Sequence, residues 1–192
     1  MRILDLHKLT DEKWLNLFAA TFEHHGHTGR WLFASRRAEP QKGPGAGDAV
    51  IIVPILRMPG EPPRLVLEKE FRVPVGDYVY GFPAGLLEPG ESVEECVRRE
   101  LREETGMEVV RFKRVTPPLY SSSGLTDESA AMAFVDVRAT PESLPKLEAS
   151  EDIEVLLLDH AGVCRLCDDT GVRIDAKVWT TLYLYQQLGQ LV

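Results

Sequence analysis

Three glutamates near the middle of the chain have the types and spacing needed for metal chemistry. Glu100, Glu103 and Glu104 fall within six residues of one another. On a helix, Glu100 and Glu104 would share one side with the apolar Val97 and Leu101. An ionised carboxylate withdrawn from water is costly unless it is paired or binds a metal, and carboxylate oxygens suit Mg²⁺ or Mn²⁺. The pattern indicates a divalent-cation site; a solvated acidic helix end with Glu–Arg pairs is the alternative.

The flanking residues predict the helix that must position these carboxylates. Residues 88–90, Glu-Pro-Gly, are typical of a tight turn. Ser92 then suits a helix N-cap, and Glu95 completes a capping box. Gly106 is the expected left-handed stop at the other end. We therefore expect a helix over residues 93–105.

The spacing of fixed residues around this helix resembles the Nudix box. Every fixed position of that motif is filled, which makes the resemblance specific, although it covers residues 85–107 only. The resemblance implies a hydrolase that cleaves a nucleoside diphosphate linked to another moiety. The matching positions are Gly85, Glu91, Arg99, Glu100, Leu101, Glu103, Glu104, Gly106 and Met107.

The resemblance also implies a role for each matched residue. The cation would be held mainly by Glu100 and Glu104, with help from Glu103 and the backbone carbonyl of Ala84. Glu103 and Arg99 would take part in catalysis, and Gly85 would approach the substrate. Glu91 and Gly106 would support the geometry of the box.

Two segments before the box add candidate substrate contacts. Residues 64–72 predict a strand with Val66, Glu68 and Glu70 on one face. Its ending, Glu-Phe-Arg, resembles the ADP-ribose branch of the family, in which such an arginine contacts substrate phosphate. Arg72 is therefore a candidate phosphate ligand, and an ordinary strand-end arginine is the alternative. Phe82, in the expected strand 78–84, is either a substrate contact or a core residue.

The polar loop 120–128 supplies one further catalytic candidate. Its Ser122-Ser123-Gly124 run and following acids resemble the Ser-Pro-Gly…Glu segment of the ADP-ribose branch, with Ser123 in place of proline. The resemblance implies that Glu128 is a general base or a ligand of a second metal. The serine leaves ADP-ribose itself open as substrate, and a solvated turn is the alternative for Asp127 and Glu128.

The expected fold is α/β: a Nudix-type α/β/α sandwich with a mixed sheet, the box helix on one side and a C-terminal helix over 175–188 on the other. A Pro/Gly-rich loop at 38–48 marks the expected domain boundary. We expect an N-terminal extension at 1–47, with a helix over 11–22 and a strand at 31–35, and a hydrolase domain at 48–192. By resemblance, the extension would pair two subunits into a homodimer.

Composition excludes several classes of partner. The net charge is −8 and no basic run exists, which argues against a nucleic-acid surface. The longest apolar run, 49–56, is too short to span a bilayer, and the first residues have no apolar leader, so we expect no membrane partner. Three cysteines are an odd number, which favours reduced thiols and a cytoplasmic protein.

We expect Mg²⁺-dependent hydrolysis of ADP-ribose or a nucleoside diphosphate sugar, giving a nucleoside monophosphate and a sugar phosphate. A hydrolase of nucleoside triphosphates or dinucleoside polyphosphates is the first alternative. A non-catalytic nucleotide-binding module and a diphosphate isomerase are less favoured, because the box is intact. Two smaller clusters predict no metal site: the histidines at 24, 25 and 27 suit a solvated loop, and His160, Cys164 and Cys167 lack the partners of a zinc shell.

Overall fold

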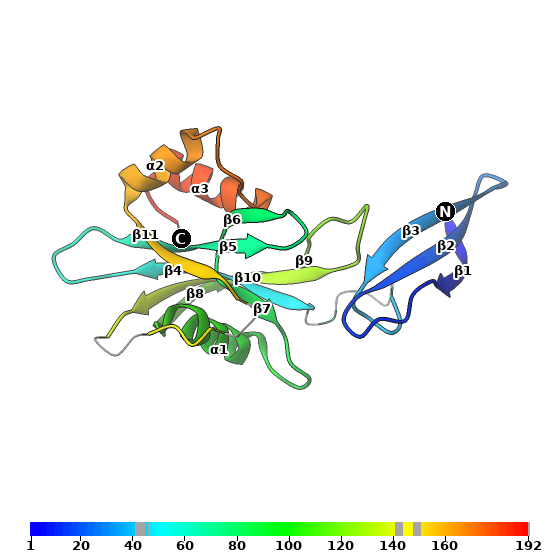
Figure 1. The fold of residues 1–192 in the computed structure, drawn as a ribbon, viewed down its shortest axis with the longest axis horizontal. Helices are drawn as coiled ribbons and strands as arrows, with labels where there is room; N and C mark the ends of the chain where they lie inside the picture. The colour runs from blue at the N-terminus through cyan, green and yellow to red at the C-terminus, as the bar shows by residue number, and fades with distance from the viewer. Residues whose placement is uncertain (41–44, 46, 141–143, 148–150, 192) are drawn as a thin grey trace. The chain divides into compact units, whose positions relative to one another are not determined.

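The computed structural model describes residues 1–40, 45, 47–140, 144–147 and 151–191. The chain forms two compact units (Figure 1). Unit 1 contains Met1–Ala49 and Pro117–Ala131, and unit 2 contains Val50–Thr116 and Met132–Val192. Over the residues described, none of the helices combines the length and the apolar character that crossing a membrane requires. The predicted domain boundary between residues 47 and 48 stays a prediction. Unit 1 also includes the segment 117–131, which lies far from its other residues in the sequence.

Unit 1 is built around a three-stranded antiparallel sheet. Strand β2 lies in the middle and pairs with both neighbours, and its hairpin with β3 closes at the pair His24↔His27. His25 and Gly26 between them both have positive φ, 49° and 78°, the conformation that a two-residue hairpin turn requires. The strands are β1 (Arg2–Lys8), β2 (Asn16–His24) and β3 (His27–Ser35).

The helix predicted over residues 11–22 is wrong, because most of that segment forms β2. Phe18 and Ala20 alternate along the strand and pack with Phe33 of β3. Thr10, which precedes the predicted helix, accepts a hydrogen bond at its Oγ1 from the Leu17 N–H, at 2.9 Å. The apolar residues satisfy both a helical and a strand pattern, and pairing with two other strands decides between them.

Unit 2 holds the central sheet, in the order β11-β5-β4-β10-β8, with β6 paired to β5 and β7 to β4. The expected strand over 78–84 is broken into β6 and β7 at Phe82-Pro83, where the Pro83 carbonyl accepts a hydrogen bond from Ile52 N–H at 2.8 Å. The strands are β4 (Ala49–Leu56), β5 (Arg64–Arg72), β6 (Asp77–Gly81), β7 (Ala84–Leu86), β8 (Glu108–Val115), β9 (Leu119–Tyr120), β10 (Ser129–Arg138) and β11 (Ile153–Leu158). Strand β9 and the first residues of β4 and β10 belong to unit 1.

Helices cover both faces of this sheet, which confirms the predicted α/β/α sandwich (Figure 1). Successive side chains point to opposite faces of each strand, so β5 contributes residues to two hydrophobic cores. Val66 packs in the core that contains Val97 of α1, and Leu65 and Leu67 pack in the core that contains Leu182 of α3. The helices are α1 (Val93–Thr105), α2 (His160–Asp168) and α3 (Ala176–Leu188).

Candidate active site

Helix α1 is fixed at both ends by the predicted caps. The N–H of Ser92 donates to Glu95 Oε2 at 2.9 Å, and the N–H of Glu95 donates to Ser92 Oγ at 3.3 Å. Gly106 adopts φ 70°, and its N–H donates to the Arg102 carbonyl at 2.9 Å. The helix therefore has fixed limits, and its apolar stripe, with Glu104 inside it, is turned toward the sheet.

Glu104 is a buried carboxylate, with 5% of its surface exposed. Its Oε2 accepts a hydrogen bond from the backbone N–H of Ala84 at 3.1 Å. Burial raises the pKa of Glu104, and the negative charges of Glu68 and Glu100 raise it further. The structure thus places the Glu104 carboxylate in hydrogen-bond contact with Ala84, the residue before the first glycine of the box.

Glu100 lies directly over the backbone of Gly85. A Cβ added to Gly85 would be 1.8 Å from Glu100 Oε1, so any larger residue would collide with the carboxylate. Burial raises the pKa of Glu100, although the hydrogen bond from Arg99 acts in the opposite direction. Because Gly85 has no side chain, the Glu100 carboxylate can pack against the β7 backbone.

Arg99 joins the acidic residues of the box into one network. Its Nε and Nη2 donate to the two carboxylate oxygens of Glu91, both at 2.9 Å. Its Nη1 donates to Glu100 at 2.7 Å and to Glu103 at 3.2 Å. The hydrogen bonds from Arg99 lower the pKa of Glu91 to about 2. Glu103 is the most accessible of these acids, with 47% of its side chain exposed.

Three more acids surround this network, and the box motif does not include them. Glu68, on β5, has 2% of its surface exposed, and within the described part of the chain its Oε1 has no hydrogen-bond partner. Glu70 and Glu151 lie close enough for their charges to raise the pKa of Glu68. The sequence feature that could have identified Glu68 as a buried acid is its position in the strand pattern, because it lies on the same face as Val66, which is fully buried.

The donor chemistry of this cluster fits a divalent cation. Burial and mutual repulsion raise the pKa values of Glu68, Glu100 and Glu104, and a bound cation would relieve the repulsion. In the described part of the chain, however, no three His, Cys, Asp or Glu side chains are arranged to hold a metal ion. In this arrangement Arg99 Nη1 donates hydrogen bonds to both Glu100 and Glu103.

The two substrate candidates outside the box have different environments. Arg72 forms an ion pair with Glu70 at 2.8 Å and keeps 49% of its side chain exposed. Phe82 is 3% exposed and belongs to the core between the sheet and helices α2 and α3. Phe82 therefore occupies the core position that the sequence left open, and its predicted substrate contact stays a prediction.

Glu128 belongs to unit 1, where it forms an ion pair with Arg36 at 2.9 Å. Its N–H donates to Thr126 Oγ1 at 3.0 Å, and its carbonyl accepts from the N–H of Ser121 at 3.0 Å. The loop is thereby tied into a defined turn rather than left as an open solvated segment. The predicted role of Glu128 toward the box stays a prediction.

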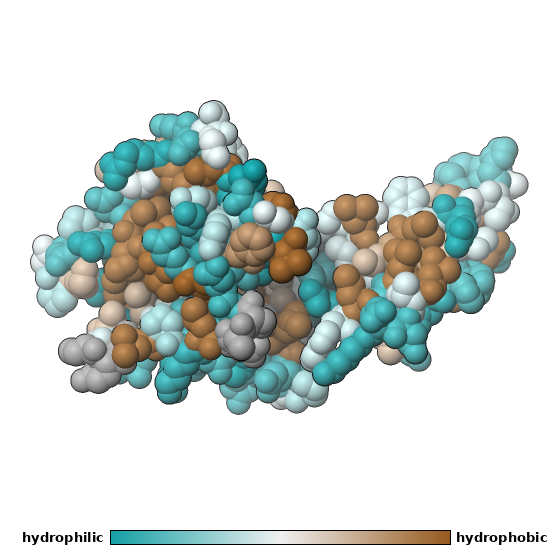
Figure 2. Space-filling model, in the orientation of Figure 1, coloured by the Kyte–Doolittle hydropathy of each residue, from teal (hydrophilic) through white to brown (hydrophobic). Residues whose placement is uncertain are grey.

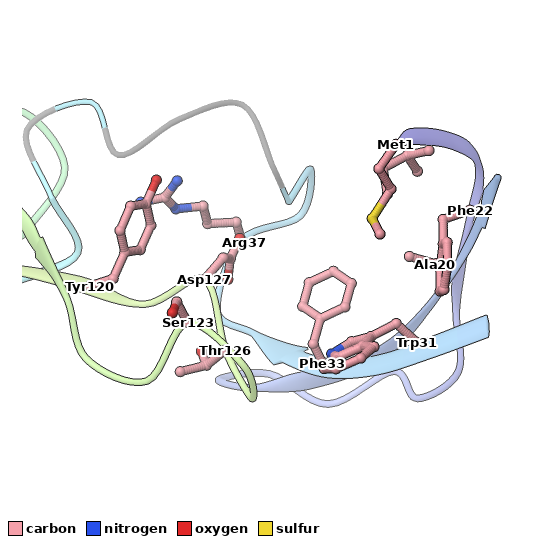
Figure 3. A pocket seen from close by; sticks show the side chains of 11 residues that line it. Met1, Ala20, Phe22, Trp31, Phe33, Arg37, Tyr120, Ser123, Thr126 and Asp127 are labelled. Atoms are coloured by element: carbon pink, nitrogen blue, oxygen red, sulfur yellow. The ribbon is translucent and has the colours of Figure 1, made fainter. Parts of the chain in front are cut away.

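Unit 1 contains a pocket of about 660 Å³ beside this loop (Figure 3). Apolar and aromatic side chains gather at one end, and Arg37 and Tyr120 lie at the other. The negative charge of Asp127 raises the pKa of Arg37, after the larger contribution of its hydrogen bond to Asp48. The apolar end is formed by Met1, Ala20, Phe22, Trp31 and Phe33.

The histidine cluster belongs to unit 1, and the cluster of His160 and the two cysteines belongs to unit 2. His24 and His25 lie at the exposed β2–β3 turn, with ring centroids 4.0 Å apart. On α2, Cys164 Sγ lies 3.7 Å from His160 Nδ1, and Cys167 is partly buried. Neither cluster meets the requirement for a metal site within the residues described.

Comparison with known proteins gives the family. The model of the NUDIX domain matches residues 45–166, more than half of the chain. The chain is 32% identical to an ADP-ribose pyrophosphatase of Bacillus subtilis over 155 residues, covering 81% of this chain and 77% of the relative. It is 29% identical to an ADP-sugar pyrophosphatase of Mus musculus over 180 residues, covering 89% and 81%.

A solved structure supports the fold. The crystal structure of an ADP compounds hydrolase superposes with a TM-score of 0.72 at 24% identity, covering 97% of this chain and 92% of the other. This chain belongs to the Nudix hydrolase family and is a Nudix pyrophosphohydrolase with the mixed α/β fold of that family. Enzymes of this family generally use a divalent metal.

Proposed function

We propose that this enzyme hydrolyses the diphosphate of ADP-ribose or of a nucleoside diphosphate sugar, giving a nucleoside monophosphate and a sugar phosphate. The observation that carries the proposal is the cluster of buried carboxylates around Glu104, next to the Ala84–Gly85 backbone. The names of two relatives, ADP-ribose pyrophosphatase and ADP-sugar pyrophosphatase, support the substrate class.

Mg²⁺ or Mn²⁺ would be held by Glu100 and Glu104, with Glu103 and the Ala84 carbonyl as further ligands. The bound cation would neutralise diphosphate charge and polarise the phosphorus. Arg99 Nη1 donates to Glu100 Oε1 at 2.7 Å, so Glu100 would offer its second carboxylate oxygen to the metal. Arg99 would keep its two bonds to Glu91, which orient its guanidinium beside the site.

The chain's own side chains would handle phosphate charge and the proton of the attacking water. About half of the Arg72 side chain is exposed to solvent. Its guanidinium would leave the ion pair with Glu70 and bind phosphate oxygens, because its planar array of N–H donors can form two parallel hydrogen bonds to a phosphate. Two residues are candidates for the base that accepts the proton of water: Glu103, through its exposed carboxylate, and Glu128, from the 120–128 loop.

A product assay tests this function directly. ADP-ribose, a UDP-sugar, a deoxynucleoside triphosphate and a dinucleoside polyphosphate are each incubated with enzyme and Mg²⁺, with Glu104→Gln as the inactive control. We expect the highest kcat/KM for one of the first two, and no turnover after chelation of the metal. A clear preference for the triphosphate or the polyphosphate would reject the substrate class and leave the hydrolase assignment intact.

We also propose that the enzyme is a homodimer that pairs through unit 1. Exposed apolar and aromatic side chains are numerous on this unit, and Figure 2 shows brown, hydrophobic residues on its visible face. Light scattering at two concentrations would show a dimer mass if this is correct. The exposed residues include Ile3, Leu4, Trp14, Leu15, Leu17, Trp31 and Leu32.

The protein is proposed to work in a reducing, cytoplasmic setting without membrane or nucleic-acid partners. Cys96, Cys164 and Cys167 are all free thiols, which agrees with a reducing compartment. Titration of accessible thiols in freshly lysed cells, without reductant, tests this. Three titratable thiols per denatured chain are expected, and a disulfide-bonded pool would contradict the proposal.

A further inference from the structure

The carboxylate of Glu68 has an environment that protein stability alone does not explain. It lies on β5, two residues after Val66, and alternation along the strand puts both on the face covered by α1. Val66 is fully buried there with Val97 and Leu101 of the helix. Glu68 is 2% exposed at the next position of the same face, where an aliphatic side chain would continue the core.

The charges around Glu68 also disfavour its ionised form. Its buried Oε1 has no hydrogen-bond partner among the residues that the structure describes, a costly state for a carboxylate. The nearby charges of Glu70, Glu151 and Glu100 oppose its ionisation. Arg72 favours ionisation, but Arg72 forms its own ion pair with Glu70 at 2.8 Å.

The charge that most strongly opposes ionisation of Glu104 is that of Glu68. One of these buried carboxylates comes from the sheet and the other from the helix, one turn after Leu101. Two buried carboxylates that are close enough for their charges to interact are stable together only with a positive charge nearby or with a proton in its place. The unpartnered oxygen of Glu68 thus belongs to the same acidic cluster as the box residues.

We propose that Glu68 is an additional carboxylate of the divalent-cation site, supplied by β5 and lying outside the Nudix box. This inference rests on the metal dependence of the proposed function. Glu68 acts on the cation, either as a ligand or by adding negative charge beside Glu104. It adds to the site a carboxylate from the sheet, whereas the other carboxylates come from the box helix. The same residue destabilises the metal-free protein, because its carboxylate is then buried without a partner.

Metal binding to the purified protein, measured without substrate, tests the inference. Calorimetric titration with Mg²⁺ and with Mn²⁺ is combined with Tm measurements, with and without metal, on wild type, Glu68→Gln, Glu68→Asp and Glu70→Gln. Glu68→Gln should raise the Tm of the metal-free protein and weaken cation binding by about 10–100-fold, the range seen when carboxylates around metal sites are removed. Glu68→Asp keeps the charge and should retain more affinity.

Glu70→Gln is the matched control, because it removes an acid from the same strand face that already has a partner in Arg72. We expect it to weaken cation binding less than Glu68→Gln does. Unchanged affinity in Glu68→Gln, equal losses in both variants, or a lower metal-free Tm in Glu68→Gln would overturn the inference; the last result would show a structural role.

The same measurements separate this inference from the proposed function. If wild type binds the cation but cleaves none of the diphosphate substrates, and Glu68→Gln still loses affinity, the proposed function fails and the inference stands. If Glu104→Gln loses binding and Glu68→Gln does not, the inference fails and the function stands. Wild type that binds no cation would overturn both.

Discussion

The carboxylate of Glu100 occupies the space where a side chain at Gly85 would begin. An added Cβ would lie 1.8 Å from Glu100 Oε1. The two residues are 15 positions apart, and strand β7 and helix α1 bring them into contact. The first glycine of the box is therefore explained by space for a carboxylate rather than by backbone conformation.

Replacing that glycine tests the relationship. In Gly85→Ala, Glu100 must move away from the β7 backbone, so we expect kcat/KM to fall by about 10–100-fold, as for other disturbances of metal-site geometry. Gly81→Ala is the control, because nothing lies within 4 Å of a Cβ added at Gly81. Its activity should stay near wild type, and similar losses in both variants would contradict the spatial explanation.

Glu104→Gln and Glu100→Gln should each remove most activity. The expected cause is loss of a carboxylate from the cation site, since either side chain lies in or beside the buried stripe of α1. In Glu104→Gln the new side-chain amide oxygen can still accept from Ala84 N–H, so the Tm of metal-free protein should stay unchanged or rise. Near-wild-type kcat at saturating Mg²⁺ would remove the metal assignment, and loss of the fold would favour a structural ion pair.

The ion pair between Arg99 and Glu91 should make stability depend on pH in the acid range. The pKa of Glu91 falls from 4.5 to about 2 in the folded protein. A lowered folded-state pKa means that the stabilisation is complete above the unfolded value near 4.5 and is lost as pH falls toward 2. In Glu91→Gln, the drop in unfolding free energy between pH 5 and pH 2 should be smaller than in wild type, as urea denaturation would measure.

The same substitution should lower stability at neutral pH by about 1.5–3 kcal/mol, the usual contribution of a hydrogen bond to a charged group. Glu95→Gln provides a comparison, because Glu95 is a capping residue whose hydrogen bonds a glutamine can still accept. If wild type and Glu91→Gln lose the same stability on acidification, Glu91 is not the group responsible.

Glu128→Gln tests the general base of the proposed reaction. A positioned base contributes about 10²–10⁴-fold, so kcat should fall by that factor while KM stays within a few-fold. Asp127→Asn, one residue earlier in the same loop, should cost much less. If Glu128→Gln is nearly silent and Glu103→Gln is severe, the base belongs to the box helix.

The sequence by itself determined the features that depend on neighbouring residues. The limits of α1, its capping box and its left-handed stop at Gly106 are all local, and the structure has them as predicted. Strand β4 coincides with the apolar run 49–56, and β5 has the limits predicted for it, 64–72. The box spacing also identified the family, because those positions are fixed relative to one helix and one turn.

Tertiary structure decided what depends on distant partners. Residues 16–24 carry a pattern that suits a helix as well as a strand, and hydrogen bonds to β1 and β3 select the strand. Glu68 and Glu104 are 36 residues apart, and no local pattern relates them. Their repulsion arises because β5 and α1 exclude water from the same interface, and burial is a property of the packed sandwich rather than of either segment.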